Sequence, residues 1–217
     1  RRIIYWNAAC LDIAAHHPDS AEREKAADMA ALLTPISKGW GTDMSVDLTG
    51  MAVQIHGGMG FIEETGVAQH YRDARITTIY EGTNGIQAMD LVGRKLGMKG
   101  GAVVLSLLDD MDVMETKIAK HPELSQSAVE IKKAIAAVRE TTNWFFKNAT
   151  NQTAVLSGAT PYLRQLSTLV GGYVMAKSAH IAVHSELPEN EKLAKINTAR
   201  FFCEQLLPGV HGLSGAV

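Results

Sequence analysis

Residues 54–87 read QIHGGMGFIEETGVAQHYRDARITTIYEGTNGIQ and concentrate glycines, charges and aromatic residues in a pattern that an ordinary helix does not need. The segment opens on a glycine-rich turn at 57–60, and it closes on a YEGT motif at 80–83, just before a second helix is expected to start. The sequence on both sides has the apolar spacing of ordinary packed helices. We therefore expect any chemistry that this chain supports to lie within residues 54–87.

Apolar residues recur at helical spacing through the rest of the chain, and no stretch shows the alternation of a half-buried strand. The sequence thus predicts an all-α fold. A helix is predicted over residues 66–77, and Thr83 or Asn84 is the expected cap of the next helix. Proline disfavours helix in the residue before it, and glycine often follows the last helical residue. On these grounds, breaks between the other helices are expected at Pro18, Gly39, Gly57, Gly97, Pro122 and Pro188.

The glycine-rich run GMKGG at residues 97–101 is the best internal boundary. We predict a helical bundle over residues 1–98, truncated at its N-terminal end, and a further helical bundle or extension over residues 99–217 that packs on it. The chain begins at Arg1, without a methionine and already within a helical pattern. We therefore expect it to be a piece of a longer protein.

Composition and charge exclude several classes of function. Hydrophobic residues make up 46% of the 217 residues, which is enough for a sizeable core. The net charge of −2 and the lack of a nucleic-acid-reading motif argue against nucleic acid as the main partner. No apolar run is long enough to form a transmembrane segment. Cys10 and Cys203 lack CxxC spacing, which favours a reducing compartment such as the bacterial cytoplasm or, in a eukaryote, the mitochondrial matrix.

Three features of residues 54–87 each allow two interpretations. The turn at 57–60 is either a helix C-cap or a stretch of backbone that a phosphate or another chain can approach closely. Glu81 lies between an aromatic residue and a glycine turn, on a loop from which it can project into a pocket. Partial burial there would make it a useful general base, and without burial it is a surface glutamate. Arg72 and Arg75 form either a solvated charged face or an ion-pair network near Glu81.

His180 and His184 lie four residues apart on one predicted helix face, a spacing that suits a metal ion. No third ligand of the usual kind is near them in the sequence. We therefore expect no metal and assign both histidines to a helix surface. His56 and His70 receive the same interpretation.

In combination, several segments resemble the C-terminal helical domain of acyl-CoA dehydrogenases. Each segment alone is weak, whereas their order and spacing together are specific. The long helical sequence after residue 101 is similar to the larger subclass of this family, which carries a helical extension. The resemblance is carried, in chain order, by LLTPISKGWGTDMS at 32–45, by Gln54 with Gly57 and Gly58, by RDARI at 72–76 and by IYEGT at 79–83.

The resemblance implies an FAD-dependent enzyme that dehydrogenates an acyl-CoA thioester between its α and β carbons, giving trans-2-enoyl-CoA. It gives Glu81 the role of the base that takes the α proton while the β hydride passes to the flavin. Tyr80 and Gly82 flank this base on the acyl-CoA side, and Thr83 matches the threonine that touches FAD. Some family members carry the base on another helix. Gly85 stands where many members have a side chain near the flavin, so that contact is not carried over.

The resemblance also implies partners. Gln54, Gly57 and Gly58 match the segment that contacts the FAD of a neighbouring subunit, so a homo-oligomer, either a dimer or a tetramer, is expected. An electron-transfer flavoprotein is the expected electron acceptor. Because the flavin-cradling domains of the family precede the part seen here, the chain alone is expected to be inactive.

An alternative is a catalytically lapsed family member that acts as a binding or assembly module. A plain structural bundle is a third possibility, but it would not need the glycine turn and the YEGT motif together. The intact Glu81 and the absence of a basic face favour the enzyme.

Overall fold

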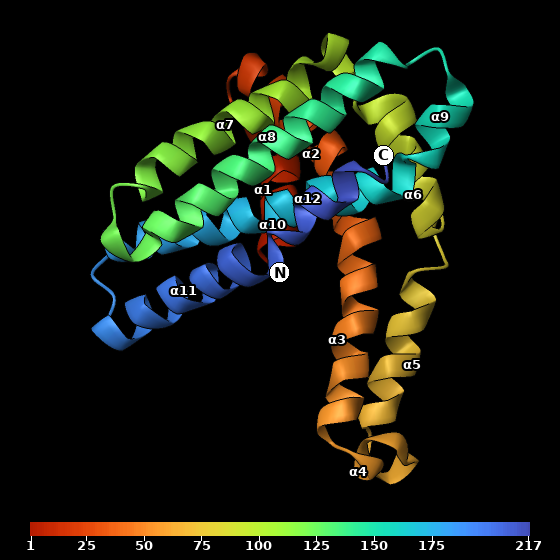
Figure 1. The fold of residues 1–217 in the computed structure, drawn as a ribbon, viewed down its shortest axis with the longest axis vertical. Coiled ribbons are helices and arrows are strands. Elements are labelled where there is room, and N and C mark those ends of the chain that lie inside the picture. Colours follow the sequence, from red (N-terminus) through yellow and green to blue (C-terminus); the bar gives the residue numbers. More distant parts are fainter.

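The computed structural model describes all 217 residues, which form helices joined by turns with no strand (Figure 1). This confirms the all-α prediction. No helix combines the length and the apolar composition that crossing a membrane requires. The α-helices, in chain order, are α1 (Arg2–His16), α2 (Ser20–Pro35), α3 (Gly41–Ile55), α4 (Gly58–Phe61), α5 (Val67–Thr77), α6 (Asn84–Asp90), α7 (Ala102–Ile118), α8 (Ser125–Lys147), α9 (Gln152–Ser157), α10 (Ala159–Val183), α11 (Glu189–Phe201) and α12 (Gly209–Ser214).

Shorter helical segments of two kinds extend or connect these helices. A π-helical segment has a wider turn than an α-helix and is often found at functional sites. The π-helical segments are η1 (Ile36–Trp40), η3 (Leu91–Lys95) and η6 (Phe202–Leu206). The 3₁₀ segments are η2 (Glu63–Thr65), η4 (Met98–Gly101) and η5 (Pro122–Leu124).

The helix break predicted near Gly39 is wrong. Pro35 and Gly41 both keep right-handed helical φ and ψ, and α2, η1 and α3 follow one another without a gap as one long helix. Proline removes one N–H from the helical ladder, yet the chain continues through a π-helical turn directly after it. Gly39 is needed for packing, because a Cβ there would lie 2.8 Å from Leu163 Cδ2 on α10.

Other predicted boundaries are confirmed. Helix α1 ends at His16, ahead of Pro18, and α5 matches the helix predicted over residues 66–77 to within one residue. The side chain of Thr83 caps α6 by accepting a hydrogen bond from the Ile86 N–H at 3.3 Å. These are the places where local sequence alone determines where a helix starts or stops.

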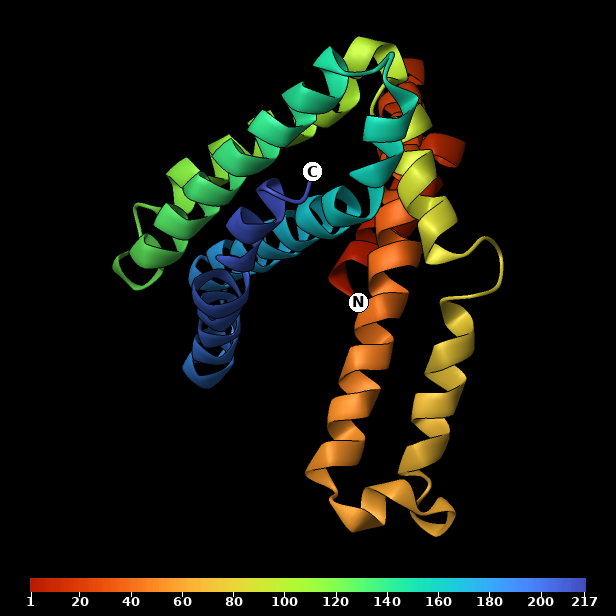
Figure 2. The same ribbon diagram turned by 45° about the vertical axis from the view of Figure 1, so that its right-hand side comes forward.

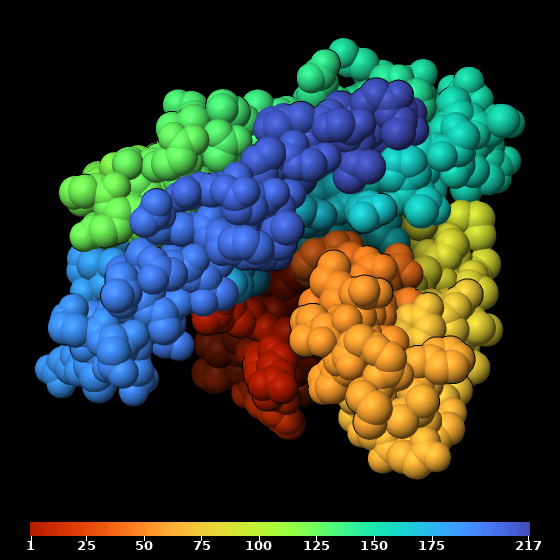
Figure 3. Space-filling view, turned by 60° about the horizontal axis from the view of Figure 1, so that its bottom comes forward, coloured from red at the N-terminus to blue at the C-terminus, as the bar shows by residue number.

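The molecule consists of a body and one projecting hairpin. Helices α3 and α5 run antiparallel away from the body, and α4 with η2 closes the hairpin at its tip (Figure 1 and Figure 2). We call this hairpin, residues 41–77, the arm. Figure 3 brings the tip forward and shows the arm standing out beside the body. Helix α3 has no buried residue, whereas the body holds a core of 40 buried residues.

Helix α10 supplies much of that core, with 15 of its 25 residues buried. Two adjacent glycines let other helices approach it closely. A Cβ at Gly171 would lie 2.7 Å from Phe202 Cζ, and one at Gly172 would lie 3.2 Å from Leu207 Cδ2. The C-terminal helices are therefore packed directly against the backbone of α10.

Residues 97–101 form a tight turn between the two halves of the chain. Lys99, Gly100 and Gly101 have positive φ values of 50°, 67° and 92°, which glycine adopts readily. Gly101 also lacks room for a side chain, because a Cβ would lie 2.6 Å from Phe146 Cζ. The core is continuous across this turn, and the division at residues 98 and 99 into two units stays a prediction.

Candidate functional site

The loop that joins α5 to α6 carries Glu81 at the base of the arm. Glu81 has a φ of 53°, and Gly82 after it has a φ of 83°. Glycine adopts this left-handed conformation freely, whereas a residue with a Cβ pays about 1–2 kcal/mol. Such strain persists only where the surroundings enforce it, and it is typical of functional positions. Glu81 and Tyr80 are both exposed, so the burial expected around a general base does not come from this chain.

A lysine from η1 holds this loop in place. Lys38 Nζ donates to the Gly82 carbonyl at 2.7 Å and to Asn84 Oδ1 at 2.9 Å. Asn84 Nδ2 in turn donates to the Gly39 carbonyl at 3.0 Å and to Asp43 Oδ1 at 2.6 Å. The backbone on the C-terminal side of Glu81 is thus tied to the long helix of η1 and α3.

Sequence reasoning missed Lys38 and the positioning role of Asn84. Lys38 lies 44 residues before Gly82, and nothing in its local sequence points to a loop so far along the chain. Only the structure shows that Lys38 lies in a π-helical turn, so the sequence offered no signal for its role.

The arginines near Glu81 do not form an ion-pair network with it. Arg72 makes a bidentate pair with Glu63, with both N–O distances at 2.7 Å, and Arg75 donates to the Thr78 hydroxyl. The side chains of the Arg72 pair are 52% and 72% exposed, so the pair stabilises the arm by at most about 1 kcal/mol. Arg72 therefore belongs to a solvated charged face.

The glycine turn lies at the tip of the arm. Gly57 has a φ of 60° and ends α3, with its N–H donating to the Gln54 carbonyl at 3.1 Å. Gln54, Gly57 and Gly58 are exposed, and a Cβ at either glycine would meet nothing within 4 Å. The turn is thus a helix C-cap, and its backbone is also open to another molecule. Both interpretations of the turn fit this geometry.

The structure does not bring the two groups of candidate residues together. Gln54, Gly57 and Gly58 lie at the tip of the arm, and Glu81 and Thr83 lie at its base (Figure 1). The 11 residues of α5 span about 16 Å between these ends. The tip and the base are therefore separate surfaces.

Comparison with known proteins identifies the family. The model described as "Acyl-CoA dehydrogenase, C-terminal domain" matches residues 6–96, and the one described as "Acetyl-CoA dehydrogenase C-terminal like" matches residues 108–217. The chain belongs to the acyl-CoA dehydrogenase family. The resemblance carried by residues 32–83 is confirmed.

Individual relatives agree with this assignment. The chain is 39% identical over 215 residues to 3-methylmercaptopropionyl-CoA dehydrogenase of Ruegeria pomeroyi, covering 95% of this chain and 36% of that protein. It is 34% identical over 224 residues to a butyryl-CoA dehydrogenase of Syntrophomonas wolfei, covering 98% of this chain and again 36% of the relative. The chain therefore spans about a third of the length of these relatives.

A solved structure shares the fold. The crystal structure of Caenorhabditis elegans ACDH-11 in complex with C11-CoA matches with a TM-score of 0.76 over 95% of this chain and 33% of that chain. Its sequence identity is 19%, so this likeness shows the fold alone.

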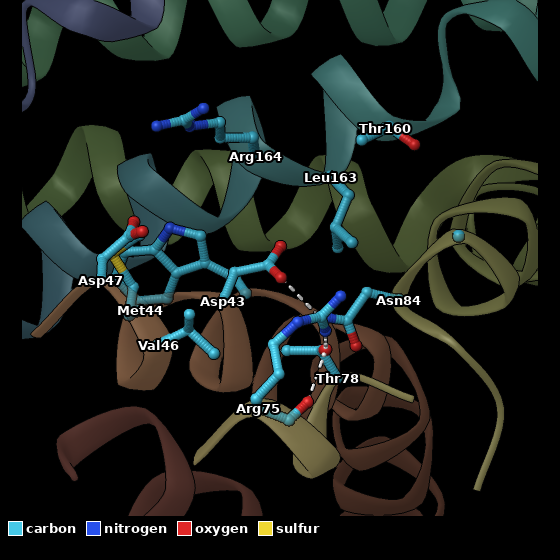
Figure 4. Close-up of a pocket in the computed structure, with 12 residues that line it drawn as sticks. Asp43, Met44, Val46, Asp47, Arg75, Thr78, Asn84, Thr160, Leu163 and Arg164 are labelled. Carbon is cyan, nitrogen blue, oxygen red and sulfur yellow. Dashed lines mark hydrogen bonds between the residues drawn. The ribbon is translucent and has the colours of Figure 1, made fainter. Parts of the chain in front are cut away.

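A cavity of about 420 Å³ lies beside the base of the arm of this acyl-CoA dehydrogenase chain (Figure 4). Arg75 and Arg164 line it together with Asp43 and Asp47, so its charges balance, and four of its 12 lining residues are hydrophobic. Glu81 does not line it. The remaining lining residues are Trp40, Met44, Val46, Thr78, Asn84, Gly85, Thr160 and Leu163.

A third histidine lies close to His180 on α10 and His184 at its C-cap, although no third ligand is near them in the sequence. His121, from the turn after α7, places its Nε2 3.2 Å from His180 Nδ1. Ligand atoms of His121, His180 and His184 lie within 4.8 Å of one another. The pKa of His180 lies below its ordinary value because of burial first, and then because of the other two imidazoles and Lys117. Sequence reasoning missed this cluster because His121 and His180 are 59 residues apart.

Proposed function

We propose that this chain is the C-terminal part of an FAD-dependent acyl-CoA dehydrogenase, with Glu81 as the base that starts the reaction. The reaction removes the α proton and the β hydride of an acyl-CoA thioester and yields the trans-2-enoyl-CoA. FAD, when bound, supplies the chemistry that accepts the hydride. The observation that carries the proposal is the strained backbone of Glu81, held by Lys38 on a loop that a surface glutamate would not require.

The role of Glu81 follows from the chemistry of the substrate. The α proton of a thioester is weakly acidic, so the carboxylate must be fixed close to it and shielded from water. Lys38 and Asn84 fix the loop, and Gly82 gives it the left-handed turn, with a φ of 83°, directly after the carboxylate. Tyr80, half exposed next to Glu81, provides an aromatic wall on the acyl-CoA side. In this proposal the water-excluding cover comes from the remaining two thirds of the enzyme.

Residues at the tip of the arm and in the loop at its base fit the cofactor at two places. The Thr83 hydroxyl is exposed at the start of α6, where it can reach a bound flavin while it caps the helix. Gln54, Gly57 and Gly58 offer open backbone at the tip, which suits close approach by the nucleotide part of FAD. Because tip and base are about 16 Å apart along α5, we propose that the tip meets the FAD of a neighbouring subunit.

This arrangement requires a homo-oligomer, either a dimer or a tetramer. Large apolar side chains on the arm support it, since Ile55 is 83% exposed and Phe61 is 80% exposed. Exposed apolar surface of this kind is typical of interaction sites.

The electrons pass from the enzyme to an electron-transfer flavoprotein in this proposal. The relatives named above act on 3-methylmercaptopropionyl-CoA and butyryl-CoA, and an acyl-CoA is the proposed substrate class.

The test is Glu81→Gln in the full-length protein that contains this chain. The amide keeps the size and hydrogen-bonding capacity of the side chain but cannot take the proton. Flavin bleaching by acyl-CoA without oxygen isolates this step, and it should slow by about 10²–10⁴-fold. Glu140→Gln, an exposed glutamate on α8, is the matched control and should bleach at the normal rate.

Two outcomes would overturn the proposal in different ways. Normal bleaching by Glu81→Gln would place the base on another helix, as in some members of the family. A wild-type protein that binds FAD but is not bleached by any acyl-CoA would support the lapsed binding or assembly module instead.

A further inference from the structure

Three imidazoles meet at the end of the body opposite α6, where the turn after α7 passes the end of α10 (Figure 1 and Figure 2). His121 lies in that turn, and His180 and His184 lie in the final turn of α10 and at its C-cap. Their ring centroids are 4.9 to 5.3 Å apart. One ligand nitrogen of each ring lies within 4.8 Å of the others. The cluster is far from the arm and does not depend on the proposed function.

The backbone holds each ring in position. His180 and His184 are four residues apart on a helix, so their side chains share one face. The N–H of His121 donates to the Ile118 carbonyl at 3.0 Å, and its carbonyl accepts from the Leu124 N–H at 2.9 Å. Ile118 and Leu124 are fully buried, and they anchor the turn on both sides of His121. The cluster is therefore built on a helix and on a pinned turn.

None of the three imidazole rings is bound to a group that would compete with a metal ion. Their single hydrogen bond is the contact between His121 Nε2 and His180 Nδ1 at 3.2 Å, and no carboxylate pairs with any of them. Crowded imidazoles without an anion repel one another once protonated. A cation that accepts the lone pairs of the ring nitrogens keeps the three imidazoles neutral and stabilises their close arrangement.

The distances suit a tetrahedral metal ion. Zinc binds histidine nitrogen at about 2.0–2.1 Å, which places tetrahedral ligand atoms about 3.4 Å apart. The His121 and His180 nitrogens already lie at 3.2 Å. His184 is exposed, so its ring can turn the short distance that completes the set.

We propose that His121, His180 and His184 bind one zinc ion, with water as the fourth ligand. Three imidazoles and an open position are a common zinc ligand set, and imidazole ligands favour zinc and its neighbours over magnesium or calcium. The ion links the turn after α7 to the end of α10, so it connects His121 to His180, which are 59 residues apart in the sequence. It thereby stabilises the folded state by an amount that grows with the logarithm of the Zn²⁺ concentration above the Kd.

The test is titration of chelator-treated protein with Zn²⁺ alone, followed by calorimetry and thermal unfolding. We expect one Zn²⁺ per chain with a micromolar or lower Kd, and a rise in Tm on binding. His180→Ala removes one of three direct ligands, so it should weaken Zn²⁺ binding by more than the about 10–100-fold that the loss of an outer-shell partner costs, and it should abolish the rise in Tm. His211→Ala, which removes an exposed histidine outside the cluster, is the matched control and should change neither quantity. Circular dichroism checks that each variant is folded.

Two further measurements sharpen the test. Co²⁺ in place of Zn²⁺ should give the intense visible absorption of a four-coordinate nitrogen site, and His184→Ala should remove it. Lys117→Gln removes an exposed positive charge that acts on His180, so it should strengthen Zn²⁺ binding. Binding only at millimolar Zn²⁺, or an equal loss in His180→Ala and His211→Ala, would mean that the metal binds scattered surface histidines and would overturn the proposal.

Discussion

Helices α3 and α10 both carry apolar residues at helical spacing, but they occupy opposite environments. Helix α10 buries 15 of its 25 residues, and α3 buries none of its 15. On α3, Leu48, Met51 and Ile55 are 63%, 59% and 83% exposed. An apolar face indicates that a helix is covered, but it does not indicate which surface covers it. In the proposed enzyme the covering surface of α3 belongs to the neighbouring subunit and to the rest of the protein.

The first prediction concerns the buried helix and has the largest expected effect. Leu166 on α10 is fully buried, and Leu166→Ala removes its contacts and leaves a cavity. Comparable substitutions lower the free energy of unfolding by about 2–5 kcal/mol. Urea denaturation of the chain, followed by circular dichroism, measures the change. A loss below about 1 kcal/mol would mean that α10 is not the centre of the core.

The second prediction uses a buried thiol beside α10. Cys203 is fully buried, and burial, with a contribution from Glu204, raises the pKa of its thiol to about 12. Because the folded state disfavours the thiolate, the contribution of Cys203 to the free energy of unfolding is fully present below pH 9, where the thiol is protonated in both states. It is lost as the pH rises towards 12. At pH 9 the native thiolate should be about 10³-fold rarer than in an unfolded chain.

Reaction with a thiol reagent checks this prediction. A Cys10→Ser variant leaves Cys203 as the single thiol, and its reaction at pH 9 is compared with and without urea. Slow reaction in the native state and fast reaction in urea are expected. Fast native reaction would show that the packing of η6 on α10 opens readily.

The third prediction concerns the joint between body and arm. Lys38→Met should remove both hydrogen bonds that hold the Glu81 loop and lower the free energy of unfolding by about 1–2 kcal/mol. Amide hydrogen exchange of residues 78–84 should accelerate, while exchange in α10 should stay slow. Lys132→Met, an exposed lysine on α8, is the control. Unchanged exchange in the loop would mean that Asn84 alone fixes it.

As with α3 and α10, the sequence could predict features that depend on residues close together in the chain, but not which distant surface a residue contacts. Helical periodicity gave the all-α fold, and the Thr83 cap followed from its own side chain, because both depend on residues close in the chain. The break near Gly39 was wrong because a glycine needed for packing against Leu163 looks the same in sequence as a helix end. Lys38 and His121 were missed because their partners lie 44 and 59 residues away.

The last prediction has the smallest expected effect and tests the comparison directly. Leu48→Ala on α3 is the same substitution as Leu166→Ala, but the leucine is 63% exposed. In this chain alone it should change the free energy of unfolding by no more than about 0.5 kcal/mol, because little apolar surface is returned to water. In the full-length oligomer the same variant should weaken subunit association, measured by sedimentation at decreasing concentration. A large loss in the isolated chain would mean that α3 is packed like α10, and an unchanged oligomer would remove α3 from the proposed interface.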